Sequence, residues 1–198
     1  SGQTRTFTVD NTPPPGGRAL TIGFWKNWAS CASSNGKGQD PMLDLALAYA
    51  SQQTTNPPGG LVVSAQNPGS LWPNYAAIWY RVLKGDATST EDSIKPAPGC
   101  LKAVRLLNKS TIDTGKKMAN DPLFNMTAQL VAAQLNRFMG ADISGITITN
   151  IDKAVLLNGK YAFNGITHGA MSAADITKAN CLAKQLDNYN NNRPVSNC

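Results

Sequence analysis

His168 is the only histidine in the sequence, which makes it the first residue to consider for acid–base chemistry. Histidine is the side chain that most often transfers protons in enzymes, because its pKa lies near neutral pH. The nucleophile pattern G-x-S-x-G is absent, however, and His168 stands in a Thr-His-Gly turn where nearby backbone groups commonly hold a neutral imidazole. The pattern favours a structural role for His168 and leaves a secreted hydrolase centred on it as an alternative.

The remaining chemistry-bearing residues show no arrangement that announces a cofactor or a metal. The chain has 12 Asp and Glu residues in no recognisable pairing, and it contains no phosphate-binding loop, dinucleotide fingerprint or metalloprotease helix. We therefore expect no cofactor, no metal site and most simply no enzyme.

Basic residues outnumber acidic ones, giving a formal net charge of +6. Lys102, Arg105 and Lys109 form the densest group, with a spacing that lies on one face of a helix. No run of five basic residues occurs, so specific nucleic-acid binding is not indicated. A solvated helix face is the simpler interpretation, and a binding site for a polyanion is the alternative.

Four cysteines, Cys31, Cys100, Cys181 and Cys198, indicate the compartment. Because none is part of a C-x-x-C pair, two disulfides are favoured over zinc. Disulfides persist in oxidising settings, so we expect an extracellular or cell-surface protein. We prefer the pairing Cys31–Cys100 with Cys181–Cys198 among the three that four cysteines allow. No apolar run is long enough to span a membrane.

The elements that must position these residues divide the chain at about residue 20. Residues 1–19 hold an alternating segment at 4–9, typical of a β-strand, and a Pro/Gly-rich linker. The strand could pair with the domain that follows, belong to a domain upstream, or be donated to another molecule to build a fibre.

Residues 20–198 are expected to form one helical domain stapled by the disulfides. Caps and apolar spacing predict helices over 42–52, 71–84, 100–107, 123–138, about 151–157, and after Ser172, with Asp175 completing a capping box. A β-branched run at 143–148 is expected to be extended. The fold class is therefore mainly α: an irregular multi-helix domain with long loops, a short N-terminal β-strand and two disulfides.

The segment 20–28 concentrates large apolar side chains directly after the linker. We expect Phe24 and Trp25 to be buried, locking this segment onto the helices, with Lys26 holding its charged end in water. The other aromatic residues could stack sugars, but Tyr75 and Trp79 lie four residues apart, as in a core stripe.

Five segments together resemble a family of exported bacterial surface domains of unassigned function, with the signature G-[YF]-W-K-[NT]-H. They are GFWKN at 23–27, AQLVAAQLN at 128–136 and LDNYNN at 186–191, together with VRLLNKS at 104–110 and FNGITHG at 163–169, which are similar to the subgroup that keeps a T-I-G-F-W-K opening. The resemblance implies a module at the end of large secreted or surface-anchored proteins, often after immunoglobulin-like repeats, with no established activity. Trp28 stands where the signature has histidine, so any role of that histidine is lost here.

These observations lead to one functional hypothesis and three alternatives. The leading hypothesis is a non-enzymatic extracellular module, structural or adhesive, whose partners would be polysaccharide or neighbouring surface-protein subunits. The alternatives are a carbohydrate- or polyanion-binding module, a secreted hydrolase, and a fibre subunit that assembles by donating its N-terminal strand.

Overall fold

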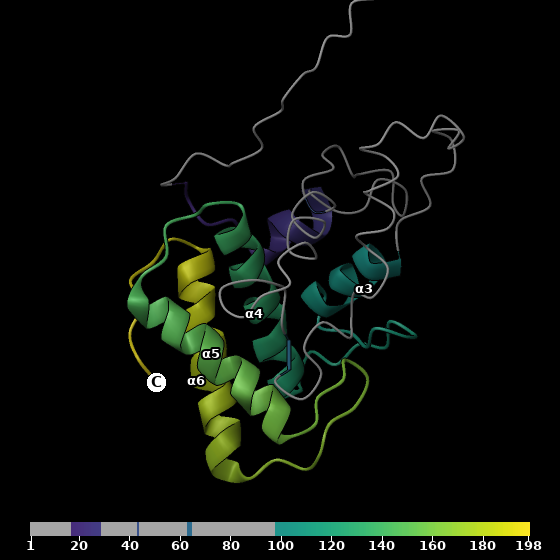
Figure 1. Ribbon diagram of the computed structural model, residues 1–198. Helices are drawn as coiled ribbons and strands as arrows, with labels where there is room; N and C mark the ends of the chain where they lie inside the picture. Colours follow the sequence, from purple (N-terminus) through teal and green to yellow (C-terminus); the bar gives the residue numbers. More distant parts are fainter. Residues whose placement is uncertain (1–16, 29–42, 44–62, 65–97) are drawn as a thin grey trace, which may run out of the picture.

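The computed structural model describes residues 17–28, 43, 63–64 and 98–198, and in this part the protein is mainly helical (Figure 1). The helices are η1 (Phe24–Trp28, a π-helix), α3 (Pro98–Leu107), α4 (Pro122–Phe138), α5 (Gly145–Lys160) and α6 (Ala173–Asn190). β-Structure among these residues is limited to two isolated bridges, Gly17–Ala141 and Ser110–Lys117. The strand expected at 4–9 and the helix expected at 71–84 lie outside the described residues, as does the helix expected at 42–52 apart from the buried Leu43.

Helix α4 is the centre of the described fold. Figure 1 shows α5 and α6 on one side of it and α3 on the other, and all three pack against it. Asp121 caps its first turn, because the carboxylate accepts from Leu123 N at 2.9 Å and Phe124 N at 3.1 Å, and Pro122 supplies a preset φ at the first helical position. The helix is buried nearly all round, as expected of a helix surrounded by others.

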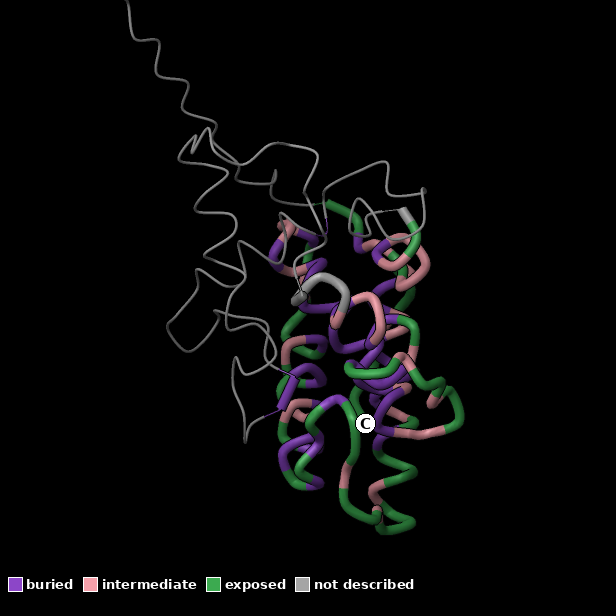
Figure 2. The backbone as a smooth tube through the Cα atoms, turned by 90° about the vertical axis from the view of Figure 1, so that its right-hand side faces the viewer, coloured by how far each residue is buried: buried purple, intermediate pink, exposed green. Residues whose placement is uncertain are grey.

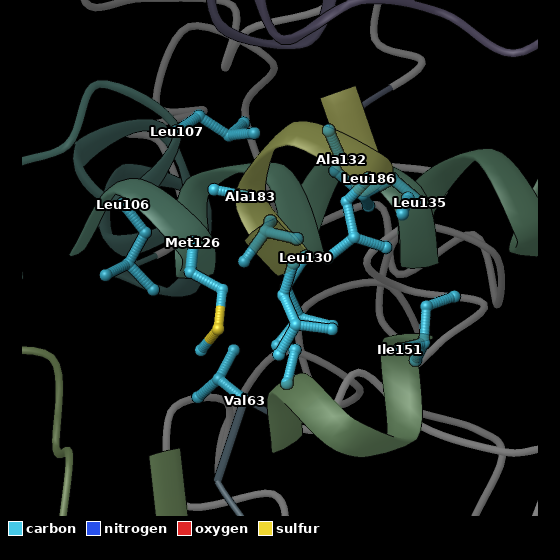
Figure 3. Close-up of a cluster of buried hydrophobic side chains, with 14 of the residues drawn as sticks. Val63, Leu106, Leu107, Met126, Leu130, Ala132, Leu135, Ile151, Ala183 and Leu186 are labelled. Carbon is cyan, nitrogen blue, oxygen red and sulfur yellow. The ribbon is translucent and has the colours of Figure 1, made fainter. Parts of the chain in front are cut away.

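The buried side chains form one continuous core around α4. In Figure 2, buried residues lie on the sides of the helices that face one another, and exposed residues lie on the sides that face outward. In Figure 3, Met126 and Leu130 of α4 lie beside Val63, which belongs to this core although it lies far away in the sequence. Asn158 holds that segment from α5 by donating to Val63 O at 2.6 Å.

Helix α5 begins earlier than the sequence predicted. The run at 143–148 was expected to be extended, and this is wrong from residue 145 onward, where α5 starts. Ser144 caps the helix by accepting from Thr147 N at 3.2 Å, and Thr147 and Ile151 are buried in the helical arrangement. Capping and burial together outweigh the weak β preference of Ile and Thr.

Helix α6 begins where the sequence predicted, after the Ser172 cap. Its expected apolar stripe is buried at Ala179, Leu182, Ala183 and Leu186, whereas Ile176 in the first turn is exposed. The disulfide Cys181–Cys198 brings the C-terminal tail back along α6, which confirms one of the two expected bonds. The other expected pair, Cys31–Cys100, lies outside the residues whose side chains are described.

Candidate functional site

His168 lies in the loop that joins α5 to α6 and contacts the start of α4. Its Nε2 is 2.7 Å from Asp121 Oδ2 and its Nδ1 is 2.7 Å from the carbonyl oxygen of Gly169. The imidazole also faces the rings of Phe124 and Phe163, at 6.4 and 6.5 Å between centroids. Asp121 therefore makes two kinds of contact. Its Oδ1 caps α4, and its Oδ2 is hydrogen-bonded to His168.

The hydrogen bonds of His168 fit a protonated ring. A carbonyl oxygen can only accept, so Nδ1 carries a hydrogen, and an ionised Asp121 likewise requires a donor at Nε2. Burial lowers the pKa of His168, but the bonds to Asp121 and Gly169 and the attraction of the carboxylate together outweigh it, so that the pKa is raised. An imidazolium with both hydrogens engaged has no lone pair with which to act as a general base.

A second polar cluster joins the end of α5 to the start of α6. Asp175 Oδ2 accepts from Lys160 Nζ and Tyr161 OH, both at 2.6 Å, and from Ser172 Oγ at 3.0 Å. The bonds from Lys160, Tyr161 and Ser172 lower the pKa of Asp175 to about 2. Ser172 Oγ accepts from Asp175 N at 3.2 Å, as a capping residue does. This cluster fixes the ends of a loop and presents no free acid or base.

The most extensive buried polar arrangement was missed by the sequence reasoning. Asn136 on α4 accepts at Oδ1 from Leu20 N at 2.8 Å and Trp25 Nε1 at 3.0 Å. Its Nδ2 donates to Leu20 O at 2.8 Å and to Asn190 Oδ1 at 2.9 Å. All four hydrogen-bonding positions of this amide are therefore used.

The bonds continue from Asn136 across α6. Asn190 Nδ2 donates to Gln129 O at 3.0 Å and Gln129 Oε1 at 2.9 Å, and Gln129 Nε2 donates to Asp187 Oδ1 at 2.9 Å. We call Gln129, Asn136 and Asn190, with their partners, the amide network. Just beyond it, Asn192 bonds both the N–H and the carbonyl of Ala19, each at 2.9 Å.

The amide network brings together three of the five segments that carry the family resemblance. Trp25 comes from 23–27, Gln129 and Asn136 from 128–136, and Asp187 and Asn190 from 186–191. The signal that could have found it is an amide in the otherwise apolar stretch of α4. Trp25 is fully buried in this arrangement, whereas Phe24, also expected to be buried, is only partly so.

Lys102, Arg105 and Lys109, the residues that could bind a polyanion, occupy different positions in the structure. Helix α3 ends at Leu107, so Lys109 lies beyond it, with a left-handed φ of 55°. Arg105 Nη1 donates to the carbonyl of Ile112 at 2.8 Å and also to that of Asp113, which ties the following loop to α3. Lys102 remains on α3 and is partly exposed.

The described residues offer neither a metal-binding cluster nor a membrane-spanning helix. No cluster of three or more His, Cys, Asp or Glu side chains could hold a metal ion in this part of the chain. None of the helices described here has the length and apolar character needed to cross a membrane.

Comparisons with known proteins give no family for this chain. No protein-family model matches it, and neither the curated proteins nor the solved structures contain a match.

Proposed function

We propose that this chain is a non-enzymatic extracellular module with a structural or adhesive role. The proposal rests on one observation. Residues 19–25 and the tail that follows α6 are both attached to the same group of helices. The amide network and Asn192 hold residues 19–25, and the disulfide holds the tail to α6. Such attachments favour a body that keeps its shape when neighbouring parts of a longer chain or a partner pull on it.

The state of the titratable groups supports a non-catalytic role. Both ring nitrogens of His168 are engaged, by Asp121 and by the carbonyl of Gly169, and the Asp175 carboxylate accepts from three donors. A general acid or base needs a ligand-facing position and a pKa matched to its task. Both groups instead connect secondary-structure elements.

The extracellular setting is supported by the Cys181–Cys198 disulfide, since such bonds are rare in reducing compartments. The resemblance to exported bacterial surface domains points the same way, and we propose membership of that family on the motifs given above. Adhesion would then involve polysaccharide or neighbouring surface-protein subunits.

The setting is tested by non-reducing peptide mapping of the protein recovered from its natural source. A linked Cys181–Cys198 peptide in the extracellular or cell-surface fraction is expected. Recovery of the protein only from the cytosol, with both thiols free, would contradict the proposal.

The absence of catalysis is tested with generic ester, glycoside and peptide substrates, using the wild type and His168→Ala. We expect no difference in turnover between the two. Turnover by the wild type that His168→Ala removes, with the circular dichroism spectrum preserved, would instead establish the hydrolase.

A further inference from the structure

We propose that Asn150 and Gln185 form a docking site for the C-terminal tail of a second copy of this chain, so that two copies can exchange their tails. We call these two residues the tail site, and the tail is residues 191–198. In the structure the tail site is filled by the tail of the same chain. The proposal does not rest on the extracellular role proposed above.

The tail site holds one residue of the tail from two helices. Asn150 on α5 donates from Nδ2 to Ser196 O at 3.0 Å, and Gln185 on α6 accepts at Oε1 from Ser196 N, also at 3.0 Å. Figure 1 shows the tail leaving the end of α6 and running past the first part of α5 to the C-terminus. Asn150 and Gln185 are buried, whereas Ser196 is exposed. The tail site therefore binds the main chain of a non-helical segment and leaves its side chain in solvent.

The tail of the same chain does not use all the hydrogen-bonding groups of this site. Asn136 bonds both the N–H and the carbonyl of Leu20, and Asn192 does the same for the preceding residue. Asn150 bonds only the carbonyl of Ser196, and its buried Oδ1 has no hydrogen-bond partner among the described residues. An unpaired buried acceptor is costly, so this amide is suited to a ligand that also brings an N–H to Oδ1.

The tail cannot easily move to meet Asn150 Oδ1, because it is fixed within its own chain at both ends. Arg193 N donates to Asn188 O at 2.8 Å, and Cys198 is bonded to Cys181. A tail from a second copy has the same sequence but is not tied to the end of the same α6. It can therefore shift along α5 until an N–H reaches Asn150, which favours a second copy as the partner.

The chain offers a point at which the tail can separate from α6. Arg193 and Pro194 are exposed, and Val195 is the next residue that packs against the core. Proline disfavours the helical conformation for the residue before it, so the chain leaves the direction of α6 here. Exchange changes the path at Arg193 and Pro194 and retains the contacts beyond them. Exchange of identical segments is a low-cost route to a two-fold dimer.

The cysteines decide when exchange is possible. The Cys181–Cys198 disulfide within one chain holds the tail in place, and with both thiols reduced the tail is held by Ser196 and Val195. After exchange, Cys198 of one copy can form a disulfide with Cys181 of the partner subunit. The two thiols give up two protons and two electrons to a small-molecule disulfide such as oxidised glutathione, which leaves as two thiols.

The test uses two full-length chains that each lack one cysteine of the pair. Cys198→Ala retains Cys181 and Cys181→Ala retains Cys198, so a linked Cys181–Cys198 peptide can form only between two chains. The chains are mixed and oxidised with glutathione disulfide, and the linked peptides are measured by mass spectrometry. Random collision would make this mixed linkage no commoner than the two symmetric linkages together. We expect it to exceed them about fivefold, because docking raises the effective concentration of the two thiols.

A matched pair of variants tests the main-chain contact. In the Cys181→Ala chain, Ser196→Pro removes the N–H that Gln185 accepts, whereas Ser196→Ala keeps both main-chain groups and removes only an exposed hydroxyl. Ser196→Pro should abolish the excess of the mixed linkage, and Ser196→Ala should leave it unchanged. Because both changes lie in the tail, the helices should fold in both variants, as circular dichroism will show.

Competing peptides test the choice of partner. A peptide with the sequence of residues 193–197 should suppress the mixed linkage about tenfold more strongly than the same peptide with Val195→Asp, since a charge replaces a packed valine. Equal suppression by the two peptides would show that the site takes any polypeptide, and would overturn the choice of a second copy.

Two other results would overturn the docking site itself: a mixed linkage no commoner than the symmetric ones, or equal effects of Ser196→Pro and Ser196→Ala. Either result would leave the proposed structural role standing, because that role needs the tail only in its own chain.

Discussion

Asn136 is the residue on which the attachment of the N-terminal segment depends. Its amide replaces the water that Leu20 and Trp25 would otherwise bond, and it does so inside the core, where an unpaired polar group is costly. Because every donor and acceptor of the amide is used, an apolar or acidic replacement must leave several partners unpaired.

We predict that Asn136→Ala lowers the free energy of unfolding by about 3 kcal/mol, since a cavity and several unpaired buried groups appear together. Urea denaturation followed by circular dichroism measures this change, and Trp fluorescence reports the surroundings of Trp25. Asn125→Ala in the same helix is the control, because Asn125 is only partly buried and lies outside the amide network. A loss no larger than that of the control would contradict the role given to Asn136.

His168 gives the protein a stability that depends on pH near neutrality. Its folded-state pKa is raised, so the stabilisation is fully present below the unfolded value of about 6.5 and is lost as the pH rises through the folded value. A change of stability in this pH range can be assigned to His168 because it is the only histidine in the sequence.

We predict that the stability difference between the wild type and His168→Gln shrinks as the pH rises from 6 to 9. Denaturation midpoints at several pH values measure it, with Lys178→Gln as a surface control that should keep a constant difference. A difference that grows with pH would mean that the histidine is neutral in the folded protein.

At the scale of elements, the loop between α5 and α6 is held at both ends by the Asp175 carboxylate. The pKa of this group is lowered to about 2 by its three donors. Its stabilisation is therefore present above the unfolded value of about 3.8 and is lost as the pH falls from there toward 2.

We predict that Asp175→Asn destabilises the protein at pH 7 and that the difference from the wild type disappears near pH 2. Thermal unfolding across this range measures it. Asp152→Asn on α5 is the control, since Asp152 is exposed and belongs to none of the ion pairs described. A difference that persists at pH 2 would show that the carboxylate acts through shape and not through charge.

The helix starts were predictable from sequence where capping is local. Asp121-Pro122 and Ser172 each act within one turn, and the structure confirms both. The start of α5 was missed although Ser144 caps it locally, because the β-branched run at 143–148 indicated an extended segment, and the burial of Thr147 and Ile151 that outweighs this preference is not visible in the local sequence. The partners of Asn136 and Asp121 likewise lie 116 and 47 residues away, at Leu20 and His168, where no local spacing could indicate them.

At the scale of the whole molecule, buried amides attach non-helical segments to the helical body. Asn136 binds Leu20, Asn158 binds Val63, and Asn150 donates to Ser196 O at 3.0 Å. Amide side chains carry no charge, so these attachments are insensitive to pH and are weakly screened by salt. This arrangement suits a sequence in which only 15% of residues are charged, and it would serve a protein exposed to changing surroundings.

The disulfide adds a covalent attachment at the C-terminal end of the same body. Cys181 and Cys198 close a segment with a sequence separation of 17, and Ser196 N also donates to Gln185 Oε1 at 3.0 Å. We predict that replacing both cysteines by Ala lowers the free energy of unfolding by about 3 kcal/mol, the chain-entropy value for a loop of this length. The double variant is preferred to chemical reduction because it leaves Cys31 and Cys100 untouched.

Loss of the disulfide should first release the tail, before the helices themselves unfold. Without the disulfide, the tail is held to the body by Asn150, Gln185 and the partly buried Val195, so limited proteolysis should cut beyond Arg193 well before the helices unfold. Asn136→Ala should leave this cleavage unchanged and expose the N-terminal segment instead, because the two attachments lie at different segments of the chain. Cleavage at both ends in both variants would show that the attachments open as one cooperative unit, and a thermal unfolding curve with a single sharp transition would accompany it.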